Sequence, residues 1–261
     1  MIHPNAIVAP GARVGANASV GAFAIVEDGV EVGENCRIAA MAVVKRGVVL
    51  APDVWVDHHA VIGGLPQDLG FDESVESGVF VGRGTRIRES VTVHRATKPA
   101  HSTRIGEGCY LMAGSHVAHD CVVGSRVILA NAATLGGHVH VGDAAFISGG
   151  VMVHQFVRIG EGVMCSGNGR FGMDVPPFVN ALERNLVAGL NLVGLRRRGF
   201  SREVIANLKE CYLAVYGDGA GGNLVAAAAA ALEAGLAREP QARAFLEFFK
   251  ADTLRQYVRP A

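Results

Sequence analysis

An aliphatic residue recurs at every sixth position, from Ile2 to Ile62 and again from Val81 to Ile159, with Pro99 as the exception. A period of six excludes an amphipathic helix, because six steps of about 100° do not return to one face. Six is even, however, so these side chains all point to one side of an extended chain. The pattern therefore predicts short parallel strands that stack as a β-helix, with the aliphatic residues in its core.

The composition agrees with this fold. Glycine is abundant, with 34 of 261 residues, and permits the tight turns that so short a repeat requires. Half of the residues are hydrophobic and 18% are charged, so the chain can bury a sizeable core. Lysine plus arginine and aspartate plus glutamate both number 24, so no net charge favours binding to nucleic acid or to an anionic membrane.

The N-terminus and the cysteines suggest a reducing, cytoplasmic setting. Residues Met1–Pro4 lack the basic and apolar regions of a secretory signal. No apolar run reaches the roughly 18 residues of a membrane span, so we expect no stable membrane insertion. The cysteines are odd in number, far apart and without a Cys-x-x-Cys pair, so we expect reduced, buried thiols. They are Cys36, Cys109, Cys121, Cys165 and Cys211.

Two interruptions of the repeat predict excursion loops at 63–80 and 94–104, of which the second preserves the phase. Loops that project from a rigid scaffold often carry binding residues. The period changes after Pro176-Pro177. We therefore expect a β-helix over 1–180 and a small helical domain over 181–261, which caps the open end of the β-helix.

Within the C-terminal region, apolar residues at helical spacing predict a first helix over 186–199. Ser201 can cap a second helix, and the glycines at Gly219–Gly222 interrupt the chain after it. Asn223 can cap an alanine-rich third helix, and Pro240 precedes a last one.

Histidines are frequent, with ten in the chain, and the segment His116–Cys121 is the one that most suggests chemistry. In it His119 precedes Asp120, a carboxylate that can orient an imidazole or stabilise its cation. Gly137-His138 and His154-Gln155 follow in later repeats. A single surface histidine is more often structural than catalytic, so the histidines alone do not define an active site.

Several further segments accompany these histidines in one order along the chain. They are Ile87–Arg95, Ile128–Leu135, Asp174–Pro177 and Gly194–Glu203. Together the segments closely resemble the UDP-N-acetylglucosamine O-acyltransferase family, over essentially the whole chain. The resemblance implies a left-handed parallel β-helix, a homotrimer, and transfer of a (3-hydroxy)acyl chain from acyl carrier protein to the 3-hydroxyl of UDP-N-acetylglucosamine at the start of lipid A synthesis. It implies no metal and no cofactor beyond the acyl carrier protein thioester, which is a co-substrate.

Matched position by position, the resemblance makes His119 the general base that takes the proton of the sugar 3-hydroxyl, with Asp120 supporting it. An unperturbed imidazole titrates near ~6.5, which suits this task at neutral pH. The backbone N–H of Gly137 would stabilise the oxyanion. Gly167 falls where the family limits the acyl length, and its missing side chain implies a longer chain.

The same matching assigns residues to substrate binding. Asp68 would contact the glucosamine, and the arginines would bind the phosphates of the nucleotide, where a guanidinium can form two parallel hydrogen bonds. On charge alone, the arginine run Arg196–Arg198 could equally be a solvated helix end or a docking patch for acyl carrier protein. The binding set is Gln67, Asp68, His116, His138, His154, Gln155, Asn191, Arg197 and Arg198.

Two stretches depart from the family pattern. The family commonly reads Gln-Asp-Leu-Lys in the first loop, where this chain has Gln67-Asp68-Leu69-Gly70 and therefore lacks a cation. Family members also tend to carry a Gly-Asn pair where this chain has Leu182–Asn185. Both departures bear on recognition of the nucleotide-sugar and neither touches His119.

Other interpretations remain open from the residues. A paralogue would acylate a 3-amino or other nucleotide-sugar, and an acetyl-CoA-dependent hexapeptide transferase would not need the C-terminal domain. A zinc hydratase of the γ-carbonic anhydrase type would use three histidine ligands, for which His116, His119 and His138 are the candidates. That interpretation gives the arginine run no role. A purely structural β-helix would leave the His119-Asp120 and Gly137-His138 pairs unexplained.

Overall fold

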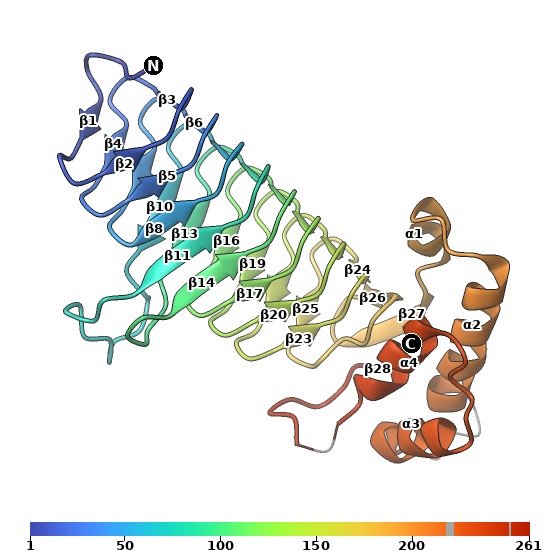
Figure 1. The fold of residues 1–261 in the computed structure, drawn as a ribbon. Coiled ribbons are helices and arrows are strands. Elements are labelled where there is room, and N and C mark those ends of the chain that lie inside the picture. Colours follow the sequence, from blue (N-terminus) through green and yellow to red (C-terminus); the bar gives the residue numbers. More distant parts are fainter. Residues whose placement is uncertain (218–221, 251) are drawn as a thin grey trace.

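The computed structural model describes residues 1–217, 222–250 and 252–261. In this part of the chain, short strands stack into three sheets that form the faces of a prism (Figure 1). Ile7 pairs in parallel with Ile25, which pairs in turn with Val43, so one coil takes 18 residues, or three hexads. The predicted parallel β-helix is confirmed.

The strands of each sheet come from successive coils. The first sheet contains β1 (Ile7–Val8), β4 (Ile25–Val26), β7 (Val43–Val44), β10 (Val61–Gly64), β13 (Thr92–His94), β16 (His116–Val117), β19 (Thr134–Leu135), β22 (Met152–Val153) and β25 (Arg170–Phe171). The second contains β2 (Arg13–Val14), β5 (Glu31–Val32), β8 (Val48–Leu50), β11 (Gly78–Val81), β14 (Ser102–Ile105), β17 (Val122–Val123), β20 (His140–Val141) and β23 (Arg158–Ile159). The third contains β3 (Ser19–Val20), β6 (Arg37–Ile38), β9 (Trp55–Val56), β12 (Arg86–Ile87), β15 (Tyr110–Leu111), β18 (Ile128–Leu129), β21 (Phe146–Ile147), β24 (Met164–Cys165), β26 (Val179–Leu182), β27 (Leu186–Leu190) and β28 (Arg259–Pro260).

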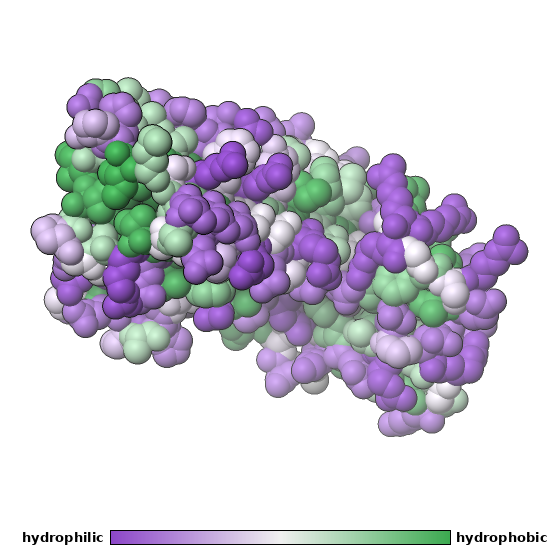
Figure 2. Space-filling model, turned by 45° about the horizontal axis from the view of Figure 1, so that its top comes forward, coloured by the Kyte–Doolittle hydropathy of each residue, from purple (hydrophilic) through white to green (hydrophobic). Residues whose placement is uncertain are grey.

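The aliphatic residues of the repeat fill the interior of the prism, as predicted. Val26, Val44 and Ile62 are completely buried, and the same position remains buried in later coils. At the N-terminal end the first coil has no coil beneath it, so Ile2 is exposed. Figure 2 shows apolar surface gathered at this end of the molecule. All five cysteines are free and buried, as expected.

Both excursion loops leave the prism at one edge, between the first and second sheets. The first loop, 65–77, joins β10 to β11, and the second, 95–101, joins β13 to β14. They are shorter than the expected 63–80 and 94–104, because β11 and β14 pair over four residues, from Gly78 with Ser102 to Val81 with Ile105. In Figure 1 the loops project from the side of the prism near β11 and β14.

The prediction of a helix over 186–199 is wrong in its first half. Leu186–Leu190 forms β27, which pairs antiparallel with β26, and the helix α1 covers only Leu192–Arg197. Pairing with the last sheet strand outweighs the helical spacing of the apolar residues, since it buries Val187 at the end of the core. The expected domain boundary at residue 180 thus falls inside β26, and strands continue to Leu190.

The remaining helices agree with the sequence. Ser201 caps α2 (Arg202–Tyr216) by accepting from Val204 N, and Asn223 caps α3 (Leu224–Glu233) by accepting from Ala226 N. The last helix, α4 (Pro240–Glu247), begins at its proline. The predicted interruption at Gly219–Gly222 lies outside the described residues except for Gly222. Among the described helices, none is long and apolar enough to cross a bilayer.

Candidate active site

Three successive turns lie one above another at the edge of the prism from which both loops emerge. They follow β16, β19 and β22, and their second residues are Asp120, His138 and Phe156, each with a left-handed backbone (φ 59°, 61° and 66°). Backbone hydrogen bonds join the turns: His138 N donates to the His119 carbonyl (3.0 Å) and Phe156 N donates to the Gly137 carbonyl (2.9 Å). The coil repeat thus stacks side chains that are 18 residues apart.

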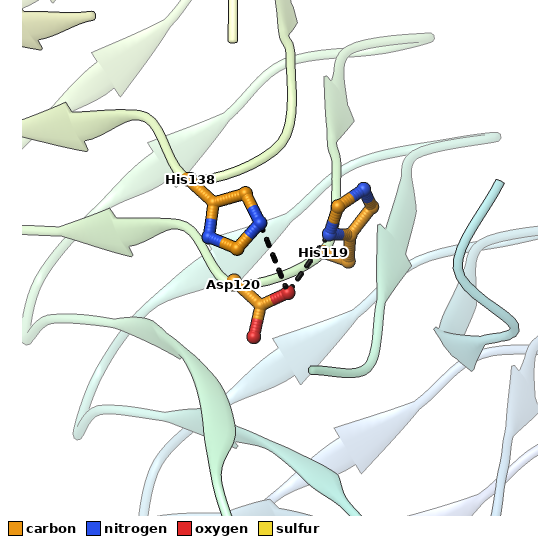
Figure 3. Close-up of side chains that lie close together, drawn as sticks. All are labelled: His119, Asp120 and His138. Atoms are coloured by element: carbon orange, nitrogen blue, oxygen red, sulfur yellow. Dashed lines mark hydrogen bonds and ion pairs between the residues drawn. The ribbon is translucent and has the colours of Figure 1, made fainter. Parts of the chain in front are cut away.

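His119 and Asp120 form a hydrogen-bonded pair, with Nδ1 2.8 Å from Oδ2 (Figure 3). The carboxylate also accepts from Thr97 in the second loop, from N at 3.1 Å and from Oγ1 at 2.8 Å. Burial tends to raise the pKa of Asp120, but the hydrogen bonds from His119 and Thr97 outweigh it and hold the pKa below its ordinary value. A charged carboxylate only accepts, so His119 donates through Nδ1, and in the neutral ring the lone pair is then on Nε2.

Gly137 lies against the His119 ring. A Cβ at this position would be 2.5 Å from Cε1 and 2.7 Å from Nε2 of His119. Among the described residues no acceptor receives a hydrogen bond from the Gly137 N–H. Glycine therefore allows the close approach of the His119 ring and leaves an unused N–H beside the nitrogen that can act as a base.

His138 completes the cluster of Figure 3, with Nε2 3.7 Å from the Asp120 carboxylate. Its ring stacks on Phe156 with centroids 4.6 Å apart and nearly parallel planes. Burial lowers the pKa of His138 by more than the neighbouring Asp120 charge raises it. The ring is therefore neutral near pH 7, with one nitrogen that donates and one that accepts.

His116 lies in β16, directly before the turn that carries His119, and faces a histidine whose role the sequence did not indicate. His116 Nδ1 bonds Thr92 Oγ1 at 2.7 Å, and its ring packs edge-on against His94 with centroids 4.7 Å apart. His94 is 9% exposed, and its Nδ1 has no partner in the part of the chain that the structure describes. Burial, followed by the charges of His116 and His119, lowers the pKa of His94 to about 4.

Arg95 and Thr97 link the first loop to the cluster. Arg95 donates to the backbone carbonyls of Val75 (2.5 Å) and Glu73 (2.8 Å), which fixes the first loop against the second. Two residues further on, Thr97 holds Asp120. No feature of the hexad pattern predicts these contacts, because both residues lie in the interruption of the repeat.

Gln67 and Asp68 are exposed on the first loop, and the Asp68 carboxylate accepts from Gly70 N at 2.9 Å. Within the described residues, neither side chain bonds the His119 cluster. The loop nevertheless leaves the same edge of the prism. It follows β10, which lies two strands before β16 in the order of the first sheet. A single chain therefore brings these residues to the side of the site but not into contact with it.

His154 and Gln155 are exposed at the turn that follows β22, directly beside Phe156. Both contact Arg255 from the C-terminal tail: His154 Nδ1 is 2.8 Å from Nη2, and the Gln155 carbonyl is 3.1 Å from Nε. The structure thus places these two predicted binding residues on the edge that carries His119 and His138.

The predicted nucleotide-binding residues lie away from this cluster, at the C-terminal end of the prism. Asn191 caps α1 by accepting from Gly194 N and donates to the Gly162 carbonyl. Arg198 pairs with Glu161 and packs over Phe200. Arg197 is exposed in the last turn of α1.

The predicted acyl-length residue, Gly167, is exposed at a different edge, between the third and first sheets. A Cβ at this position would have only the Gly149 carbonyl nearby, at 3.6 Å. Within one chain, the surface around Gly167 is therefore open enough to accept a side chain.

His119, Asp120 and His138 have ligand atoms within 4.8 Å of one another, a spacing that could hold a metal ion. His116 is not a member of this group, so the described residues of one chain do not assemble the three histidines that a zinc hydratase would need. The same residues can also act without a metal. His119 and Asp120 are hydrogen-bonded to each other as a general base and the carboxylate that orients it.

Comparisons with known proteins agree with this geometry. A family profile described as UDP-N-acetylglucosamine O-acyltransferase, domain 2, matches residues 174–258, and a profile of bacterial transferase hexapeptides matches 11–46 and 102–137. An acyl-[acyl-carrier-protein]–UDP-N-acetylglucosamine O-acyltransferase from Sulfurihydrogenibium sp. is 60% identical over 213 residues, which cover 81% of this chain and 78% of the relative. A relative of the same name from Halorhodospira halophila is 43% identical over 84% of this chain and 85% of its own length.

Solved structures match over nearly the whole chain. The UDP-N-acetylglucosamine acyltransferase from Bacteroides fragilis superposes with a TM-score of 0.92 at 35% identity, covering 99% of this chain and 100% of that one. The enzyme from Campylobacter jejuni gives 0.90 at 32% identity, with 99% of each chain covered. The fold and the site therefore define a hexapeptide-repeat acyltransferase built on a left-handed parallel β-helix. Within that class, the chain belongs to the UDP-N-acetylglucosamine O-acyltransferase family.

Proposed function

We propose that this protein transfers an acyl chain from acyl carrier protein to the 3-hydroxyl of UDP-N-acetylglucosamine, the first step of lipid A biosynthesis. The observation that carries the proposal is the His119–Asp120 pair with Gly137 beside it, on a chain that is 60% identical to a relative named for this reaction. The interpretations as a zinc hydratase and as an acyltransferase for another sugar have no support among the relatives.

The His119–Asp120 pair is suited to general base catalysis. Nδ1 donates to the charged carboxylate, so Nε2 can take the proton of the sugar 3-hydroxyl as its oxygen attacks the thioester carbonyl. Asp120 then stabilises the imidazolium that forms. When the tetrahedral intermediate collapses, the C–S bond breaks and the same proton passes from His119 to the departing thiolate. The ester is formed and the base is regenerated.

The negative charge of the intermediate requires a donor near His119. The unused N–H of Gly137 lies beside the His119 ring, so it can donate to the oxyanion as charge develops. His138 is neutral and lies on the other side of Asp120, where it can donate to an oxygen of the sugar or of the thioester. His116 and Gln155 extend the same edge in both directions and can position the substrate along it.

The remaining parts of the site depend on assembly. Gln67 and Asp68 on the first loop, and Asn191, Arg197 and Arg198 at the C-terminal end, do not meet the cluster within one chain. A homotrimer, in which each subunit supplies one side of the site, would bring them to it. We propose this trimer, a cytoplasmic setting in which acyl carrier protein is available, and catalysis without a metal or other cofactor.

The experiment is an acyl-transfer assay with purified protein and a series of 3-hydroxyacyl and plain acyl carrier protein thioesters. UDP-N-acetylglucosamine and its 3-amino analogue are offered as separate acceptors. The proposal predicts turnover with the hydroxyl acceptor. Turnover confined to the amino acceptor would show that the departures at Gly70 and Leu182–Asn185 have changed the acceptor.

A further inference from the structure

The C-terminal tail, residues 252–258, lies back along the edge of the prism that carries the site. Asp174, which is completely buried, holds it: Thr253 Oγ1 donates to the Asp174 carboxylate at 2.7 Å. The backbones also pair, with Asp174 N donating to the Gln256 carbonyl and Val258 N to the Asp174 carbonyl. These bonds fix the tail on both sides of Arg255. The tail is therefore more than a cover for the end of the β-helix.

Arg255 uses the guanidinium to contact two consecutive residues of the turn after β22. Nε donates to the Gln155 carbonyl at 3.1 Å and Nη2 lies 2.8 Å from His154 Nδ1. Phe156, the next residue of that turn, stacks on His138 of the catalytic cluster. One side chain of the tail thus braces the turn that supports His138 and presents His154.

The contact with Arg255 also decides which nitrogen of His154 carries the proton. A guanidinium has five N–H donors and no acceptor, so His154 Nδ1 must accept. The same Nδ1 lies 3.3 Å from the Gln155 carbonyl, which would favour a proton there, but a proton on Nδ1 would face the Arg255 donor at 2.8 Å. The contact with Arg255 is the shorter of the two and therefore the stronger, so the proton of the neutral ring is on Nε2.

We propose that Arg255 is a positioning residue of the active site, which holds His154 in its Nε2–H tautomer as a hydrogen-bond donor to substrate. The inference rests on the proposed acyl transfer. Every candidate partner near the reacting centre, whether thioester carbonyl, sugar hydroxyl or phosphate, has an oxygen that accepts. A histidine fixed as a donor therefore suits each of them, whereas the other tautomer could bond only to a hydroxyl.

The test is a double-mutant cycle between Arg255→Ala and His154→Ala, measured as kcat/KM for acyl transfer. Because Arg255 acts through His154, Arg255→Ala should lower kcat/KM by about tenfold in the wild type and have little effect in His154→Ala. Arg255→Lys keeps a donor and should recover part of the loss. Arg259→Ala is the matched control, since Arg259 lies in β28 directly after the tail and within the described residues bonds only through its backbone.

Equal losses from Arg255→Ala with and without His154 would overturn the proposal, because a structural role of the tail is additive. A second readout needs no activity: histidine ¹⁵N NMR of the purified protein should show His154 protonated at Nε2 alone, and Arg255→Ala should release the other tautomer. If the wild type transfers no acyl group, the proposed function fails and the NMR result still decides the role of Arg255. Protonation at Nδ1 in the wild type would refute it.

Discussion

Gly137→Ala tests how tightly the chain positions its base. The backbone of Gly137 is not left-handed, so alanine is compatible with the turn and strain comes only from the new Cβ. That atom would be 2.5 Å from His119 Cε1 and 2.7 Å from Nε2, and an ordinary contact is no closer than 3.4 Å. The ring must therefore move by about 1 Å, which is enough to cost about 100-fold in rate at a catalytic group.

The movement also opposes the hydrogen bond to Asp120, because the ring is fixed between that carboxylate and Gly137. Alanine keeps the backbone N–H, so the loss reports displacement of the base and not removal of the oxyanion donor. We expect kcat to fall by about 100-fold with a nearly unchanged melting temperature.

Gly149→Ala is the control, since its Cβ would meet only the Asn131 carbonyl at 3.4 Å. The assay is steady-state acyl transfer, combined with a crystal structure of the Gly137→Ala variant. Wild-type kcat for Gly137→Ala would refute the reasoning, and so would an unmoved His119 ring.

Three further predictions follow from the site and its surroundings. Asp120→Asn removes the charge that stabilises the imidazolium, so kcat should fall by about 100-fold or more while the protein remains folded, as steady-state kinetics and circular dichroism would show. His94 has a pKa of about 4 when folded against 6.5 when unfolded, so the unfolded chain takes up the proton first as pH falls. The free energy of unfolding should therefore drop between pH 6.5 and 4, by up to about 3 kcal/mol from this group, and urea titrations should show a smaller drop for His94→Phe than for the exposed control His101→Phe. Gly167→Leu adds a side chain at the predicted acyl-length position, where the surface has room for it. The added side chain should occupy space that the end of a long acyl chain would use, so the preferred acyl chain in competition assays should become shorter. An unchanged preference would show that Gly167 is not part of the acyl site.

The hexad period was sufficient to predict most of the fold. Because the repeat is even and the core position is aliphatic in nearly every hexad, both the strand direction and the register follow from residues such as Val26, Val44 and Ile62. The helix caps at Ser201 and Asn223 could also be predicted, because each depends only on residues nearby in the sequence, and both are confirmed. The strand β27 was not predictable from its own residues, since Leu186–Leu190 becomes a strand only by pairing with β26.

The active-site residues likewise divide into those that could be predicted from the sequence and those that could not. His119, Asp120 and His138 were identified by their motifs and by the resemblance to the family, and in the structure the coil length of 18 residues stacks their turns. Thr97, Arg95 and Arg255 were missed, because their contacts join a loop or the C-terminal tail to a turn that is distant in the sequence. Asn191 and Arg198 were identified by motif, but their partners in one chain, Gly194 and Glu161, are structural.

Acyl transfer by the purified wild-type protein and by His119→Ala tests the central claim most directly. The measurement is turnover of UDP-N-acetylglucosamine with 3-hydroxyacyl carrier protein, at matched concentrations of folded protein. The account predicts turnover by the wild type and a loss of about 10²-fold or more in His119→Ala. Wild-type activity that persists in His119→Ala would contradict the assignment of the base, and a folded wild-type protein without turnover would contradict the proposed reaction.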